Sequence, residues 1–122
     1  MERIRVDSGS EMGNALGFTS DLFSGWFELE KGRKLYLHYI ISRKKNEGNT
    51  QALIRRWLSE GYDLHIIMPR PIMRHILEKF RFVHAYEYIP DHYEYPVEVW
   101  RSAESLPGFC HGVSEKIKAE SG

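Results

Sequence analysis

The sequence predicts a single α/β (α+β) domain of 122 residues whose elements follow the order β-β-β-α-β-α-β-β. Three observations predict this class. Two segments rich in aromatic and β-branched residues flank the turn signal Lys31-Gly32, which is typical of a β-hairpin. Two segments with apolar residues at helical spacing then alternate with a short apolar segment. Two segments of alternating polarity follow, and they indicate a closing hairpin.

The first half of this order contains a hairpin and a helix. We expect strands over residues 20–30 and 34–42, on either side of the turn. Asn49 or Thr50 can cap the helix that follows, and Gly61 ends it. The helix is amphipathic, because its apolar residues fall on one face: Leu53, Ile54, Trp57 and Leu58.

The second half repeats the pattern. Residues 62–68 read as a buried strand, and Pro71 suits the first turn of a second helix. The apolar residues of this helix again share one face: Ile72, Met73, Ile76, Leu77 and Phe80. Residues 83–89 and 95–101 should pair as the closing hairpin, and Pro96 indicates an edge or bulge position because proline cannot donate to a ladder.

Both ends of the chain differ from this ordered centre. The N-terminal end is dense in Ser and Gly, and the C-terminal end carries Pro107-Gly108 and only scattered hydrophobic residues. We therefore expect one domain over residues 1–122, with loosely ordered arms at about 1–17 and 103–122.

The composition limits the classes of partner and the cellular compartment that we expect for the protein. Seventeen basic side chains cancel seventeen acidic ones, so net charge does not steer the molecule towards nucleic acid or an anionic membrane. Cys110 is the single cysteine and excludes an internal disulfide. The polar start and the lack of a long apolar run argue against a signal peptide or a spanning helix. We expect a cytoplasmic protein, in the host cytoplasm if the gene is viral.

The loop between the second strand and the first helix has the features of a phosphate site. The first turn of a helix leaves backbone N–H groups unsatisfied, and residues 46–50 supply them here. Gly48 permits close approach of a ligand to the backbone, and Arg43, Lys44 and Lys45 add positive charge. The loop is therefore a candidate cradle for a pyrophosphate. The alternative is an ordinary solvated turn.

Residues 35–82 resemble the core of the GCN5-related N-acetyltransferases (GNAT). Residues 45–50 stand where this family has the acetyl-CoA loop Gln/Arg-x-x-Gly-x-Gly/Ala. Residues 76–82, Ile-Leu-Glu-Lys-Phe-Arg-Phe, are similar to the helix end that often reads Leu-Tyr-Glu-Lys-x-Gly-Phe in the family. The short first section is similar, more loosely, to small phage-encoded members. The resemblance implies a mixed, mostly antiparallel central sheet with helices on both faces.

The resemblance also implies an acyl-CoA-dependent N-acyltransferase, which moves an acetyl group from acetyl-CoA to an amine of a small molecule or a protein. The thioester would lie between the strands at 35–41 and 62–68, which splay apart. The implied acetyl-CoA contacts are Ile40, Ile41, Lys45, Asn46, Glu47, Gly48, Asn49 and Thr50.

The family's usual catalytic groups are replaced in this chain. In many members a tyrosine protonates the departing thiolate, but the matching residue here is Leu77, and the segment 69–71 lacks the usual asparagine. Replacement acid or base groups are His38, Tyr39 and Glu28, with Tyr86 and Tyr88 as further candidates. His38 stands first because its ordinary pKa is near neutrality, although a histidine in an aromatic strand is more often a satisfied, half-buried side chain. Solvent-facing alternation explains Tyr39 and Glu28 equally well.

Two other classes of function remain as alternatives. One is a non-catalytic GNAT-like structural or interaction protein, for instance a component of a viral particle. The other is a nucleic-acid module, but the basic residues on or beside the helices are more simply the polar sides of amphipathic helices: Arg55, Arg56, Arg70, Arg74, Lys79 and Arg81.

Two further sets of residues do not indicate a specific function. Aromatic residues in the closing hairpin suit core packing or a homodimer contact: Tyr86, Tyr88, Tyr93, Tyr95 and Trp100. Cys110, His111, His84 and His92 lack the two tight ligand pairs typical of small zinc domains, so we expect no metal site.

Overall fold

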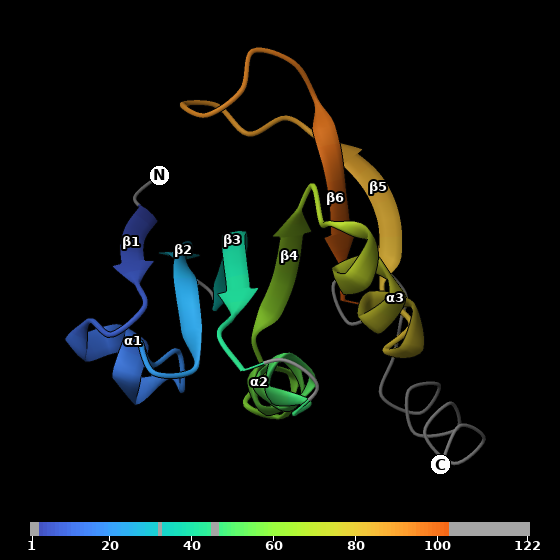
Figure 1. Cartoon of the computed structure of the whole chain (residues 1–122). Helices are drawn as coiled ribbons and strands as arrows, with labels where there is room; N and C mark the ends of the chain where they lie inside the picture. The colour runs from blue at the N-terminus through green and yellow to red at the C-terminus, as the bar shows by residue number, and fades with distance from the viewer. Residues whose placement is uncertain (1–2, 32, 45–46, 103–122) are drawn as a thin grey trace.

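A computed structural model describes residues 3–31, 33–44 and 47–102 of the chain (Figure 1). Its elements are β1 (Arg3–Asp7), α1 (Glu11–Ala15), β2 (Phe23–Glu30), β3 (Lys34–Ser42), α2 (Asn49–Ser59), β4 (Asp63–Ile67), α3 (Pro71–Lys79), β5 (Val83–Glu87) and β6 (Val97–Arg101). The six strands form one sheet in the order β1-β2-β3-β4-β6-β5. Only β3 and β4 pair in parallel, so the sheet is mixed. The α+β class and the mixed sheet are as predicted.

The N-terminal segment is more ordered than the sequence predicts. β1 pairs with β2 along its whole length, and its Val6, opposite Phe27, is only 2% exposed. Ser10 caps α1 by accepting a hydrogen bond from the Gly13 N–H. For residues 3–17 the expectation of a loose arm is therefore wrong, because the Ser and Gly residues there form a cap and tight turns. The other expected arm, 103–122, lies outside the described residues.

The helices α2 and α3 cover the same face of the sheet. Leu53 and Trp57 of α2 and Leu77 of α3 belong to one buried cluster, together with Leu35 and Leu64 of the sheet. Both crossovers, β3-α2-β4 and β4-α3-β5, join parallel strands and move in the same direction across the sheet. Right-handed crossovers then place their helices on one side. In the part of the chain described, the expectation of helices on both faces is not met.

A loop covers part of the opposite face. Residues 88–96, between β5 and β6, arch over the end of the sheet towards β2 (Figure 1). Ile89 in this loop is fully buried, in a second core cluster with Tyr36, Ile67 and Val99. β6 is an internal strand between β4 and β5, so Pro96 does not mark an edge; it lies just before the strand begins.

No helix in the described part of the chain is long and apolar enough to cross a membrane.

A β-bulge interrupts the β2–β3 pairing. Trp26 faces Tyr39 and Phe27 faces Leu37, which leaves His38 as the extra residue of β3. Gly25 lies beside the bulge with φ +141°, and a Cβ atom there would be 1.9 Å from the carbonyl oxygen of Tyr39. The close approach of the two backbones therefore requires glycine at this position.

We predict that Gly25→Ala lowers the free energy of unfolding by about 2–4 kcal/mol, because backbone strain and the clash with Tyr39 act together. Gly48→Ala is the matched control: Gly48 also has a positive φ, of +71°, but nothing lies within 4 Å of its added Cβ atom. This control should lose only about 1–2 kcal/mol. Urea denaturation measures both values, and equal losses would contradict the role assigned to the close approach.

Candidate functional site

The strands β3 and β4 separate midway along β3. Their pairing runs from Lys34 opposite Asp63 to Leu37 opposite Ile66, whereas β3 continues to Ser42. Beyond Leu37, β3 pairs only with β2. Among the described residues, no strand covers the other edge of residues 38–42. Main-chain groups on this edge are available to a ligand.

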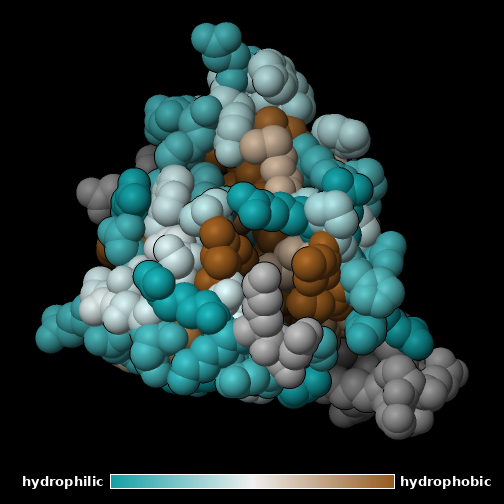
Figure 2. Space-filling view, in the orientation of Figure 1, coloured by the Kyte–Doolittle hydropathy of each residue, from teal (hydrophilic) through white to brown (hydrophobic). Residues whose placement is uncertain are grey.

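A cavity of about 580 Å³ lies at this separation. The second half of β3, the start of α2, the end of β4 and α3 line it. Figure 2 shows hydrophobic residues on either side of a hollow, in the region between α2 and α3 of Figure 1. Its apolar lining includes Ile41, Met68 and Ile72, which are 38%, 46% and 80% exposed. The cavity therefore offers an apolar surface next to an open strand edge.

Most of the predicted acetyl-CoA contacts lie at this cavity. Its lining includes five of them: Ile40, Ile41, Gly48, Asn49 and Thr50. Glu47 is exposed and is not part of the lining. Lys45 and Asn46 lie outside the described residues. The structure also adds Lys44 and Arg70 to the lining, so two basic side chains border the cavity.

The N-terminus of α2 has no side-chain cap. Gly48, rather than Asn49 or Thr50, is the N-cap residue, and it adopts the left-handed conformation with φ 71° and ψ 17°. The side-chain nitrogen of Asn49 is buried and makes no hydrogen bond. Because no side chain of the described residues accepts from the first turn, its backbone N–H groups are available to an anionic ligand.

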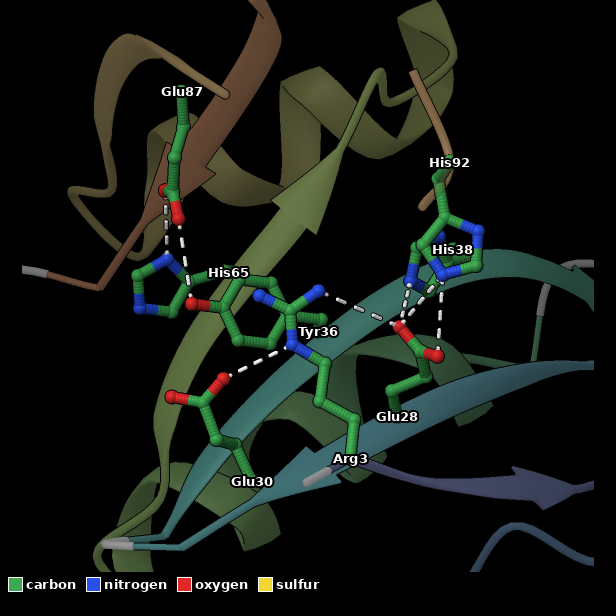
Figure 3. Close-up of polar contacts among 8 residues, drawn as sticks. All are labelled: Arg3, Glu28, Glu30, Tyr36, His38, His65, Glu87 and His92. Atoms are coloured by element: carbon green, nitrogen blue, oxygen red, sulfur yellow. Dashed lines mark hydrogen bonds and ion pairs between the residues drawn. The ribbon is translucent and has the colours of Figure 1, made fainter. Parts of the chain in front are cut away.

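The bulge places His38 in a cluster with Glu28 and His92. The His38 Nε2 atom lies 2.9 Å from Glu28 Oε1, and His92 Nε2 lies 3.1 Å and 3.2 Å from the two carboxylate oxygens. Figure 3 shows both imidazoles pointing at this carboxylate. Trp26 stacks on the His38 ring with centroids 4.2 Å apart. The three residues form one polar contact between β2, β3 and the 88–96 loop.

Burial and hydrogen bonding together shift the pKa values of His38 and Glu28. The His38 side chain is only 3% exposed, and although Glu28 favours the charged form, burial lowers the pKa of His38 below its ordinary value. Burial raises the pKa of Glu28, but the hydrogen bonds from His38 and His92 outweigh it, and the net shift is downward. Taken as a whole residue, His38 is half-buried, but its side chain is not exposed. The atoms of His38 that solvent can reach therefore belong to the main chain. The imidazole is thus enclosed.

The three predicted catalytic residues differ in their access to the cavity. Tyr39 lines it and is 41% exposed, with the Arg70 guanidinium 5.7 Å from the centre of its ring. His38 lines it, whereas Glu28 is not part of the lining and contacts His38. His92 is a further member of this cluster, and no local sequence pattern connects it with Glu28, since 64 positions separate the two residues. The buried Ile89, three residues before His92, is the local signal that the loop folds onto the sheet.

A second polar cluster surrounds His65 on β4. The His65 side chain is 3% exposed, and its Nδ1 atom lies 3.2 Å from Glu87 Oε1 while its Nε2 atom lies 3.4 Å from Asp63 Oδ1. The Tyr36 hydroxyl donates to the other oxygen of Glu87 (Figure 3). Burial lowers the pKa of His65, but the two carboxylates outweigh burial and raise it above its ordinary value. The hydrogen bond from His65 lowers the pKa of Glu87.

We predict that His65→Gln destabilises the fold in a pH-dependent way. Because the pKa of His65 is raised in the folded state, its contribution is complete below the ordinary value of 6.5 and is lost as the pH rises through the folded value. The variant should be about 1–3 kcal/mol less stable than the parent near pH 6, and the difference should shrink towards about pH 9.

Urea denaturation at the two pH values measures this difference. His84→Gln is the control, because His84 is 45% exposed and pairs with Glu98 outside both clusters. A difference that stays constant over the pH range would mean that His65 contributes only packing.

No protein-family model matches the chain, and comparisons with curated proteins and with solved structures give no significant match.

Proposed function

We propose that the protein is an acyl-CoA-dependent N-acyltransferase that transfers an acetyl group from acetyl-CoA to an amine of a small molecule or a protein. The observation that carries this proposal is the cavity at the separation of β3 and β4, with an uncapped helix N-terminus at one end. An open strand edge, an apolar lining and a set of free N–H donors match the three parts of the ligand: an amide-containing arm, a thioester and a pyrophosphate.

The pantetheine arm of acetyl-CoA would add to β3 as a strand would. Its amide groups would bond main-chain groups near Ile40 and Ile41, whose outer edge pairs with no strand in the described part of the chain. The pyrophosphate would accept from the first-turn N–H groups of α2, with Lys44 beside it. This arrangement is supported by the lining of the cavity, which includes both the second half of β3 and the start of α2.

The chemical step needs a proton donor. The amine attacks the thioester carbonyl, the C–S bond breaks, and the thiolate that leaves gains a proton while the attacking amine loses one. Tyr39 is our candidate donor because its side chain is exposed and it lines the cavity. His38 is less suitable for direct transfer, since its imidazole is enclosed.

Calorimetric titration with acetyl-CoA tests the proposal, with CoA and ATP as comparison ligands. We expect both CoA compounds to bind with micromolar affinity and ATP not to bind, because the strand edge recognises the pantetheine arm. The variant Gly48→Glu should abolish binding, since it brings a carboxylate to the site of the pyrophosphate. Gly48→Gln is the matched control, with the same size and the same backbone strain but no charge.

Two outcomes would contradict the site. If Gly48→Glu bound acetyl-CoA as well as the parent, the pyrophosphate would not lie at α2. If neither acetyl-CoA nor CoA gave heat or a change in melting temperature with the parent, the protein would not be an acyl-CoA enzyme.

We further predict that Tyr39→Phe lowers kcat by about 100-fold or more and leaves the acetyl-CoA affinity unchanged, because a phenyl ring cannot protonate the thiolate. Release of CoA in the presence of an amine that the parent acetylates measures the rate. Tyr86→Phe is the control: Tyr86 is 69% exposed and does not line the cavity. An unchanged kcat in the Tyr39 variant would remove Tyr39 from the mechanism.

A non-catalytic GNAT-like structural or interaction protein is the second candidate. One observation favours it: Leu77, which occupies the position of the family's usual tyrosine donor, is fully buried in the core cluster. On this reading the cavity would be a remnant and the titration would show no CoA binding.

A further inference from the structure

We propose that Glu28, His38 and His92 form a binding site for a divalent transition-metal cation of the zinc type. The three residues come from β2, from the bulge of β3 and from the 88–96 loop. The proposal does not depend on the acyltransferase function. It replaces the sequence-based expectation of no metal site, which considered His92 with Cys110 and His111 rather than with this pair.

The spacing of the donor atoms suits a metal ion. One ligand atom from each residue can be chosen so that all three lie within 4.8 Å of one another, and each imidazole nitrogen is 2.9–3.2 Å from a Glu28 oxygen. With zinc–ligand bonds of about 2.0–2.1 Å, neighbouring ligands of a tetrahedral ion are about 3.3 Å apart. The two carboxylate–imidazole distances therefore need to change by only tenths of an ångström, whereas the two imidazole nitrogens, which are at most 4.8 Å apart, have to approach each other by up to about 1.5 Å. His92 lies in a loop, which can supply this movement.

The donor set is selective. Two imidazoles and one carboxylate are typical of zinc and related first-row cations, whereas Mg²⁺ and Ca²⁺ prefer oxygen ligands alone. The His92 side chain is 27% exposed, compared with 3% for His38 and 13% for Glu28. The cluster is thus closed on the sheet side and open towards solvent, where water can complete the coordination.

The nearby arginine does not cancel the charge of the site. The Arg3 Nη1 atom lies 3.9 Å from Glu28 Oε1, but Arg3 donates a shorter hydrogen bond of 3.0 Å to Glu30. One positive and two negative side chains leave this part of the face with a net negative charge. A cation is therefore favoured rather than repelled.

An ion at this position would attach the 88–96 loop to the sheet. The loop is otherwise held on this face by the buried Ile89 and by Tyr93, which packs against the same cluster. Residue His38 also lines the cavity beside β3. A bound cation would thus stabilise both the loop and the bulge.

Thermal denaturation of the full chain with added ZnCl₂, after removal of adventitious metal, tests the site. We expect the melting temperature of the parent to rise by about 5–10 °C at a hundredfold excess of free Zn²⁺ over Kd. His92→Gln should abolish the rise and still fold, because His92 is the most exposed of the three side chains. His84→Gln should keep the rise, since His84 pairs with Glu98 elsewhere. MgCl₂ should have no effect.

Cobalt binding provides a second readout. Co²⁺ in this site should give the visible absorption of a four- or five-coordinate ion without the near-ultraviolet band that a thiolate ligand adds, and His92→Gln should remove it. An unchanged melting temperature in the parent would overturn the proposal. So would a rise that persists in His92→Gln, or a thiolate band that disappears in Cys110→Ser, because the metal would then bind elsewhere. None of these outcomes bears on acetyl-CoA binding.

Discussion

The bulge at His38 is the constraint on which the arrangement of the candidate site depends. Before the bulge, alternate residues of β3 such as Leu35 and Leu37 face the helices, as a regular strand requires. The extra residue resets the alternation, so that Ile40 packs against the same core while Tyr39 and Ile41 become exposed. Bulges generally increase the local twist of a strand, and this one lies where β3 and β4 part. The open strand edge, the cavity and the polar cluster thus all depend on one local irregularity of the backbone.

The sequence predicts the centre of the fold well because hydrophobic periodicity is a local property. The helix starting at Asn49, the buried β4 and the closing hairpin of β5 and β6 are observed as expected. The predicted order includes a third strand before the helix at Asn49, but the sequence does not place it at Arg3–Asp7, because five residues with only one buried side chain, Val6, carry little periodic signal. The side of the sheet that each helix covers depends on strand order, which no single segment contains.

The candidate site could be predicted only in part, because only some of its parts are contiguous in the sequence. The start of α2 and the edge of β3 are contiguous stretches, and a sequence motif can describe them. The contacts between Glu28, His38 and His92 join segments far apart in the chain, and the surroundings of His65 join β4 to β5. Such contacts depend on the register of strand pairing and on the path of one loop. Residue types therefore suggested the candidates, but only the fold could show which of them meet.

The position of β6 has a consequence for how the chain folds. β5 has no contact with β4 in the sheet, because β6, which follows it in sequence, lies between them. During synthesis, one edge of β4 therefore stays unpaired until residues 97–101 have left the ribosome. The sheet of the described residues can be completed only at that point. Until then, the apolar edge of β4 is exposed to other chains. A protein built in this way gains from fast closure of the final hairpin, for which the short separation of β5 and β6 in sequence is well suited.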